Sequence, residues 1–250
     1  MIPELPLLVA VGFCAGVCNA VVGGGTLFTF PVLIATGIPP VLANTTTTVA
    51  LLPGTMTSAF AFLPELHALR QQLTTRIVTA STGGLLGATL LLWSGNTVFF
   101  YVVPWLLGVA TILFTLSRWI VRRAKLASHR ASHWRLLAME FSSEVYGGYF
   151  GAAIGILLIA SMAIAGQEDM QSVNAQRNFL VVFINGMAAV LFIVLGTVDW
   201  PVAFILMGGA IIGGYCGARL ARHLPNLWMR RVVTAAGAFF SLYYFVKAYG

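Results

Sequence analysis

The sequence predicts an all-α polytopic membrane protein with two inverted repeats, each made of three full spans plus a broken helical hairpin, or about 8–10 helical segments. Three observations lead to this fold class. Of the 250 residues, 59% are hydrophobic and 8% are charged, whereas a soluble chain carries roughly 25% charged residues. The apolar runs are long enough to cross a bilayer as helices, and they lack the alternation of a barrel strand. The chain also resembles itself at a fixed spacing of 130 residues.

The internal repeat rests on matching glycines and needs no gap. The pattern Gly-Gly-x-x-Gly-Ala occurs at 83–88 and again at 213–218, and Asn44 corresponds to Asn174. We expect both glycine sets to form helix-packing faces, because small residues let helices approach closely in a membrane. Two copies of one membrane unit are typical of secondary transporters, whose substrate site lies between the copies. Duplication that serves stability alone is the alternative.

The first half is predicted to contain one broken hairpin and three spans. Its first apolar run, 5–37, is too long for one simple span and is interrupted by three glycines at 23–25. Each glycine costs ~1 kcal/mol in a helix relative to alanine, so we expect two arms, at about 5–22 and 26–37. The three spans are expected at about 43–63, 73–93 and 97–119.

A basic segment is predicted to join the halves. Residues 118–135 contain six lysines and arginines and no acidic residue, which is the strongest cytoplasmic signal in the chain. The second half is expected to have its hairpin at about 138–165 and its spans near 174–197, 200–221 and 226–248. We therefore divide one transmembrane domain, 1–250, into a first repeat at 1–119, a basic cytoplasmic linker at 120–137 and a second repeat at 138–250.

The arginine positions predict that the repeats are inverted. If 118–135 lies in the cytoplasm, the positive-inside rule also places Arg219, Arg222, Arg230 and Arg231 there. This requires an even number of crossings between the clusters, which two spans and a hairpin returning to its own side provide. Both termini are then expected outside the cytoplasm. Whether the hairpin arms fully cross the bilayer stays open.

Polar residues at matching positions of the halves form the candidate substrate site. Residues 44–48 open one span and residues 174–178 open its counterpart, each after a broken hairpin. Half-helix N-termini carry free N–H groups and a positive dipole end that suit an anion, and Arg177 adds a full charge. Capping, helix packing or, for Arg177, a position at the membrane interface are the alternative roles. The candidate substrate-binding residues are Gly24, Gly25, Thr26, Asn44, Thr45, Thr46, Thr47, Asn174, Gln176, Arg177 and Asn178.

Other polar residues in apolar sequence have open roles. Glu140 and Glu144 lie one helical turn apart and could relay protons or form a solvated face. Asn19 and Asn185 could each be only an interhelical hydrogen bond. The three cysteines lie in apolar stretches and are expected to pack as small hydrophobic residues. We expect no metal, no cofactor and no catalytic centre, because the sequence contains none of the usual nucleotide, metalloprotease or hydrolase motifs.

Short glycine-rich motifs give the chain a resemblance to a known family. The order of these motifs over the whole chain is similar to that of the sulfite exporter TauE/SafE family of membrane permeases. The residues that carry the resemblance are Gly23-Gly24-Gly25-Thr26, Pro31, Gly37, Ala43-Asn44-Thr45, Gly151-x-x-x-Gly155 and Asn174 to Asn178. The resemblance implies transport of sulfite, sulfoacetate, taurine-derived sulfonates or other small organic anions across the bacterial inner membrane.

The chain departs from that family's pattern at two places. Asn44-Thr45-Thr46 stands where the family often has Gly-Thr-Ser, and Gln176-Arg177-Asn178 stands where it often has Thr-Lys-Asn. The second change keeps the charge and alters the donor geometry. The particular anion therefore stays open.

The expected partners follow from this reading. They are a small anionic substrate, the lipid bilayer and, left open, a coupling proton or cation and a second copy of the chain in a homodimer. The net charge of +7 does not indicate nucleic acid, because the basic residues lie in loops beside spans. A passive anion channel and a non-transporting membrane assembly partner are the alternative functions.

Overall fold

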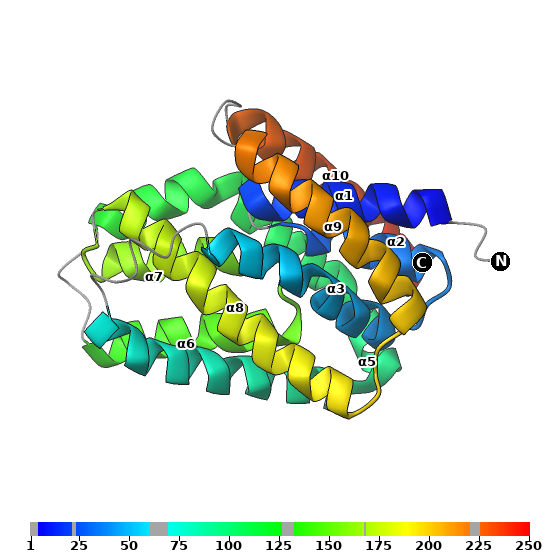
Figure 1. The fold of residues 1–250 in the computed structure, drawn as a ribbon, viewed down its shortest axis with the longest axis horizontal. Coiled ribbons are helices and arrows are strands. Elements are labelled where there is room, and N and C mark those ends of the chain that lie inside the picture. Colours follow the sequence, from blue (N-terminus) through cyan, green and yellow to red (C-terminus); the bar gives the residue numbers. More distant parts are fainter. Residues whose placement is uncertain (1–4, 22–23, 61–69, 127–132, 168, 221–225) are drawn as a thin grey trace.

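The fold is a bundle of helices joined by turns (Figure 1). This computed structural model describes residues 5–21, 24–60, 70–126, 133–167, 169–220 and 226–250, and these residues contain nine helices and no strand. The helices are α1 (Leu5–Val21), α2 (Thr26–Ala35), α3 (Pro40–Phe60), α5 (Arg70–Leu126), α6 (His133–Tyr149), α7 (Ile154–Ile164), α8 (Met170–Val194), α9 (Trp200–Leu220) and α10 (Asn226–Tyr249).

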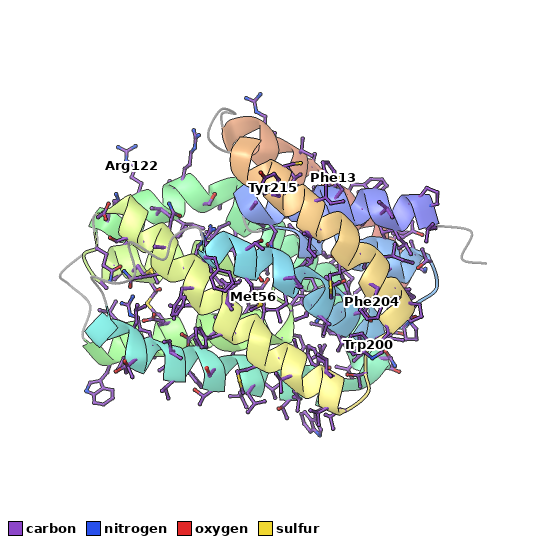
Figure 2. All side chains as sticks on the ribbon, viewed as in Figure 1. Phe13, Met56, Arg122, Trp200, Phe204 and Tyr215 are labelled. Atoms are coloured by element: carbon purple, nitrogen blue, oxygen red, sulfur yellow. The ribbon has the colours of Figure 1, made fainter. Side chains whose placement is uncertain are left out.

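The predicted all-α membrane class is confirmed by the length and composition of these helices. Among the described residues, four stretches are long and apolar enough to cross a membrane: Leu73–Lys125, Ser172–Val194, Trp200–Gly217 and Arg231–Tyr249. Large apolar side chains such as Phe204 and Tyr215 lie exposed on the outside of the bundle (Figure 2). Such a surface suits contact with lipid tails, which are as apolar as the side chains themselves.

The first predicted hairpin is broken at the glycines where a break was expected, and the second is broken at a position that the sequence prediction left open. The first hairpin consists of α1 and α2, and α2 begins directly after the glycines at 23–25. The second consists of α6 and α7, with the turn between them formed by Gly151 at φ 80° and Ala153 at φ 63°. Residues with these positive φ angles cannot continue a right-handed helix, so the chain reverses there.

Two boundaries differ from the sequence prediction. The spans expected at 73–93 and 97–119 lie in one element, α5, which is interrupted at Gly95 (φ 67°, ψ 174°). The element also runs on to Leu126, and α6 begins at His133, so both ends of the predicted linker 120–137 are helical. Lysine and arginine are good helix formers, and they interact favourably with the carbonyl end of a helix, so the basic residues extend α5.

The hairpins pack across the two halves through glycines. The first arm α1 packs along α9, where a Cβ atom on Gly12 would lie 2.5 Å from the Leu206 carbonyl oxygen. The first arm α6 packs along α5, where a Cβ atom on Gly83 would lie 2.6 Å from Cβ of Glu144. The predicted packing faces at 83–87 and 213–217 are therefore confirmed, because backbone or Cβ atoms of the other half occupy the space beside them at Gly83 and Gly213.

An aromatic cluster joins the two hairpins in the core. The Phe30 ring on α2 lies 5.4 Å from the Phe150 ring in the second hairpin turn and 5.7 Å from the Phe99 ring on α5, both in edge-on geometry. All three side chains are buried. Edge-on aromatic pairs add to the free energy of burial, so this cluster holds the start of α2 close to the start of α7.

Candidate functional site

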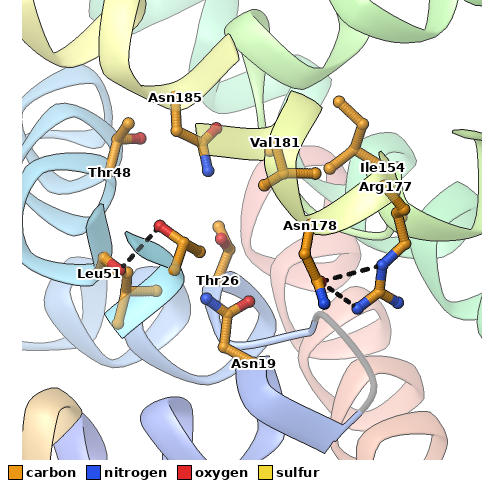
Figure 3. A pocket seen from close by; sticks show the side chains of 12 residues that line it. Asn19, Thr26, Thr48, Leu51, Ile154, Arg177, Asn178, Val181 and Asn185 are labelled. Carbon is orange, nitrogen blue, oxygen red and sulfur yellow. Dashed lines mark hydrogen bonds between the residues drawn. The ribbon is translucent and has the colours of Figure 1, made fainter. Parts of the chain in front are cut away.

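A small polar cavity lies between the two halves. Its volume is ≈ 30 Å³, which is enough for roughly two water molecules. Helices α1, α2, α3 and α8 and the second hairpin turn with the start of α7 surround it. In Figure 3, Thr48, Asn185, Thr26 and Asn19 converge on this space from four different helices. The cavity is therefore built from both halves of the chain.

Equivalent helix faces form two walls of the cavity. The wall residues are Thr48, Leu51 and Thr55 on α3 and Asn178, Val181 and Asn185 on α8. Each α8 residue stands 130 positions after its α3 counterpart. Within each helix the three residues have spacings of three and four, which place them on one face. The sequence repeat thus recurs in space as two matching polar faces on one cavity.

Two helix N-termini also reach the cavity. Thr26 is the first residue of α2 and Ile154 is the first residue of α7, and both line the cavity. Neither helix has a side-chain hydrogen bond at its N-cap. The two starts lie close together, since a Cβ atom on Gly151 would be 3.8 Å from the Thr26 hydroxyl. The first N–H groups of a helix have no partner within the helix and carry positive partial charge, so this region favours an anion.

Arg177 brings a full positive charge to the same cavity. The side chain is 8% exposed. Its Nη2 and Nε donate hydrogen bonds of 2.6 and 3.2 Å to Oδ1 of Asn178, as Figure 3 shows. Gly155 makes room for it, because a Cβ atom there would lie 3.1 Å from Cδ of Arg177. Among the described residues, no carboxylate forms an ion pair with Arg177.

The environment of Arg177 is suited to an anion. A buried charge is costly unless a counter-charge or several hydrogen bonds compensate it. Its described partner here is a neutral amide oxygen. An oxyanion in the cavity would complete the pairing with charge-assisted hydrogen bonds. The side-chain amides of Asn19 and Asn185 would supply further donors.

Three of the predicted site residues line the cavity: Thr26, Arg177 and Asn178. Gly25 lies next to it as the N-cap of α2, and a Cβ atom there would lie 2.7 Å from the Ala15 carbonyl oxygen. Gly24 instead faces the Phe114 and Val233 side chains of α5 and α10. The two glycines thus serve the close approach of α2 to its neighbours, and a substrate role for them stays a prediction.

The residues that open α3 contact the second half away from the cavity lining. The Asn44 amide donates 3.0 Å to the Tyr149 carbonyl oxygen at the end of α6. The Thr45 hydroxyl contacts the Thr197 carbonyl oxygen, and the Thr46 hydroxyl accepts a 3.0 Å hydrogen bond from the Asp199 N–H. Oδ1 of Asn44 and the hydroxyl of Thr47 are buried without a hydrogen-bond partner among the described residues. Their predicted role in substrate binding stays untested.

The residues that open α8 divide between two environments. Asn174 is half-buried and does not line the cavity. Gln176 faces away from it, where its Oε1 accepts a 2.6 Å hydrogen bond from Arg76 and its amide donates 3.1 Å to Gln167. Gln176 and Arg177 are neighbours in sequence, but successive helical residues point about 100° apart. Only Arg177 and Asn178 of this segment therefore reach the cavity.

Several cavity residues were missing from the sequence-based site. Asn19, Asn185, Gly151 and Gly155 line the cavity but are not among the substrate-binding residues that the sequence predicts. Thr55 had not been singled out. The signal that could have found Thr55 and Asn185 is a polar residue at the same repeat position in both halves, seven residues after Thr48 and Asn178. That spacing returns to the same helix face after two turns.

Comparison with known proteins gives a consistent match over the chain. The family described as sulfite exporter TauE/SafE matches residues 8–244. The chain is 26% identical to a probable membrane transporter protein of Haemophilus influenzae over 92% of this chain and 89% of that protein. It is 25% identical to the probable membrane transporter protein ORF9 of a Sinorhizobium species, over 87% and 83% of the two chains. The probable membrane transporter protein YfcA of Escherichia coli is 24% identical over 95% and 88%. No solved structure matches the chain.

Proposed function

This chain belongs to the sulfite exporter TauE/SafE family, and from that premise we propose that it is a secondary transporter that carries small anions across the bacterial inner membrane. The favoured substrates are sulfite, sulfonates and other sulfur-containing organic anions. The chain is a multi-pass membrane transporter by family and by its apolar helices. We propose in addition its substrate class, its transport mechanism and its orientation in the membrane.

The observation that carries the anion assignment is Arg177. Its buried guanidinium has no carboxylate partner among the described residues, and it lines the same cavity as two helix N-termini that have no side-chain cap. All of these groups donate hydrogen bonds or carry positive charge, and none would favour a cation. The ≈ 30 Å³ cavity suits a group of about two waters in size, such as a small oxyanion or the head of a sulfonate.

We propose alternating access as the mechanism. The cavity lies between equivalent faces of α3 and α8, one from each half. A tilt of one half against the other would close the cavity to one side and open it to the other. The first arm of each hairpin packs against the other half, α1 along α9 and α6 along α5. This reciprocal packing supports a mechanism in which the two halves move relative to each other. An inverted relation of the halves would make the two access states equivalent.

Two alternatives remain distinct from this proposal. A passive channel would need a polar lining that continues to both sides of the membrane, whereas the cavity lined by Arg177 has a volume of only ≈ 30 Å³. A non-transporting assembly partner would have no need of a buried cation beside a cavity. The flux experiment below separates all three.

Reconstituted protein is expected to exchange sulfite with saturable kinetics. Vesicles containing the purified chain and unlabelled sulfite should accumulate labelled sulfite from outside, because a carrier exchanges bound anions one for one. Sulfate and sulfoacetate complete the panel of anions, and protein-free vesicles measure leakage. Flux that rises linearly with concentration would indicate a channel. No flux of any anion in the panel would overturn the transporter proposal.

Cysteine labelling tests the proposed orientation. In a variant with Cys14, Cys18 and Cys216 replaced by alanine, a cysteine replacing Thr97 should react with an impermeant maleimide in intact cells. A cysteine replacing Arg123 should react only after the membrane is opened. Both positions are exposed. They lie near opposite ends of the part of α5 that follows the interruption at Gly95. The reverse pattern would mean that the basic end of α5 lies outside.

A further inference from the structure

A second buried polar cluster lies beside the cavity, at the contact of α5, α6 and α8. Glu144 on α6 is 0% exposed, and Glu140, one turn earlier, is 7% exposed. The Thr79 hydroxyl of α5 donates 3.3 Å to Oε1 of Glu144. Nε of Arg76 lies 3.5 Å from Oε1 of Glu140. Oε2 of Glu144 and Oε1 of Glu140 accept no hydrogen bond from any described group.

The cluster holds more acidic groups than basic ones. From α5 it receives Arg76, and from α8 the neutral Gln176. Helix α7 has no ionisable residue, and Arg177 on α8 lines the cavity instead. Tyr146, on α6, is half-buried, and its buried hydroxyl has no hydrogen-bond partner among the described residues. Two carboxylates one turn apart repel each other, and one guanidinium offsets only one of them. One bound proton would make this buried group of charges neutral.

Helix packing alone does not require these charged residues. The positions of Glu140 and Glu144 correspond to Ala10 and Cys14 in the first half, and Arg76 corresponds to Leu206. The equivalent contact of the first hairpin, α1 against α9, is made with apolar side chains and the same kind of close glycine approach. Buried ionisable groups are costly in a membrane and are mostly retained for function. The asymmetry therefore indicates a role that only one of these two equivalent contacts has.

A direct contact links this cluster to the helix that carries Arg177. Nη1 of Arg76 donates a 2.6 Å hydrogen bond to Oε1 of Gln176, the residue before Arg177. Arg76 thus contacts a carboxylate on α6 and an amide on α8 at once. A change of charge on the carboxylates alters the attraction on Arg76 and, through Gln176, the first turns of α8.

We propose that Glu144, with Glu140 beside it, binds the proton that is coupled to anion transport. The inference rests on the proposed transport function and deepens it. The carboxylate takes one proton from water on one side of the membrane, becomes a neutral carboxylic acid, and releases the same proton on the other side. No other bond forms or breaks. Arg76 and Gln176 pass the change of charge to α8, so proton binding and anion binding at Arg177 favour the same state.

Sulfite uptake into vesicles of higher internal pH tests the proposal. The external pH is held constant, so the ionisation of external sulfite does not change, and the membrane potential is clamped. With one proton carried with each anion, a pH difference of about one unit should drive about tenfold accumulation of the transported anion, because a factor of ten corresponds to ~1.4 kcal/mol. A proton ionophore should abolish it. In Glu144→Gln, accumulation should be lost while labelled sulfite still exchanges for unlabelled sulfite, now with little dependence on pH.

Cys14→Ala, at the equivalent position of the first half, is the matched control and should accumulate sulfite like the unaltered protein. If the unaltered protein shows no exchange, the transport proposal itself fails. If it exchanges sulfite but a pH difference drives no accumulation, or if Glu144→Gln accumulates normally, the proton site is wrong and the transport proposal stands. If Glu144→Gln does not exchange sulfite, accumulation and exchange are measured on Glu140→Gln instead. Loss of pH-driven accumulation with exchange retained supports the proton site, and normal accumulation overturns it.

Discussion

Replacing Arg177 with glutamine is expected to reduce sulfite exchange about ten- to a hundredfold. Hydrogen bonds to a charged group contribute roughly 1.5–3 kcal/mol, and each ~1.4 kcal/mol changes an equilibrium constant tenfold. Glutamine keeps polar atoms in the cavity but removes the buried charge that faces the proposed anion. The loss should appear mainly as a higher sulfite concentration at half-maximal exchange in reconstituted vesicles.

Two further variants show whether charge or shape is responsible. Arg177→Lys keeps the charge but loses the planar fork of donors, so its exchange should fall between that of Arg177→Gln and that of the unaltered protein. Arg122→Gln removes an exposed arginine near the end of α5 that does not line the cavity and points away from the bundle (Figure 2), and should exchange normally. If Arg177→Gln had the same half-maximal concentration as the unaltered protein, Arg177 would not bind the substrate.

Replacing Gly209 with leucine is expected to prevent correct packing of α9 on α1. A Cβ atom on Gly209 would lie 2.5 Å from the Val9 carbonyl oxygen and 2.8 Å from the Phe13 nitrogen. Both are backbone atoms, so a whole helix must move to make room. Overpacking a core costs roughly 1–3 kcal/mol or more, and the contact of α1 with α9 joins the two halves. The variant should show a lower melting temperature and aggregation after extraction in mild detergent.

Gly208 is the matched control, because it is the neighbouring residue on the same helix. It is exposed, and a Cβ atom there would meet nothing within 4 Å. Gly208→Leu should therefore stay monodisperse, and its helix should gain stability, since leucine forms helix better than glycine. Equal behaviour of the two variants would mean that α1 does not lie against α9 in the membrane.

The helices could be predicted from the sequence because their signals are local. Long apolar runs need helical hydrogen bonding in lipid, and glycines or prolines mark where such runs stop. The expected arm 5–22 is α1, Leu5–Val21, and the expected span 200–221 is α9, Trp200–Leu220. The end of α5 at Leu126 was not predicted, because a positive charge indicates a side of the membrane and does not by itself end a helix.

The site could be predicted only in part. Arg177 and Asn178 stood out as polar residues early in an apolar span, and Thr26 as the first residue after a glycine break. Gln176 and Asn44 are likewise polar residues early in apolar spans, but they do not line the cavity. Gln176 is hydrogen-bonded to Arg76, and Asn44 is hydrogen-bonded to the Tyr149 carbonyl oxygen. Composition does not distinguish these cases. Position along a helix fixes the face on which a residue lies, but the packing of the other helices decides whether that face meets the cavity or a neighbouring helix.

The sequence by itself determined the membrane class, the internal repeat, the broken hairpins and the presence of a cation, Arg177, early in an apolar span, since each follows from residue type and spacing along the chain. Only the tertiary structure decided which polar residues meet. The matching faces that begin at Thr48 and Asn178 meet on one cavity because each hairpin packs against the other half. The pairing of Arg76 with Glu140 and Gln176 likewise joins three helices. Such contacts depend on how helices approach one another, and the order of residues within a single helix does not specify that approach.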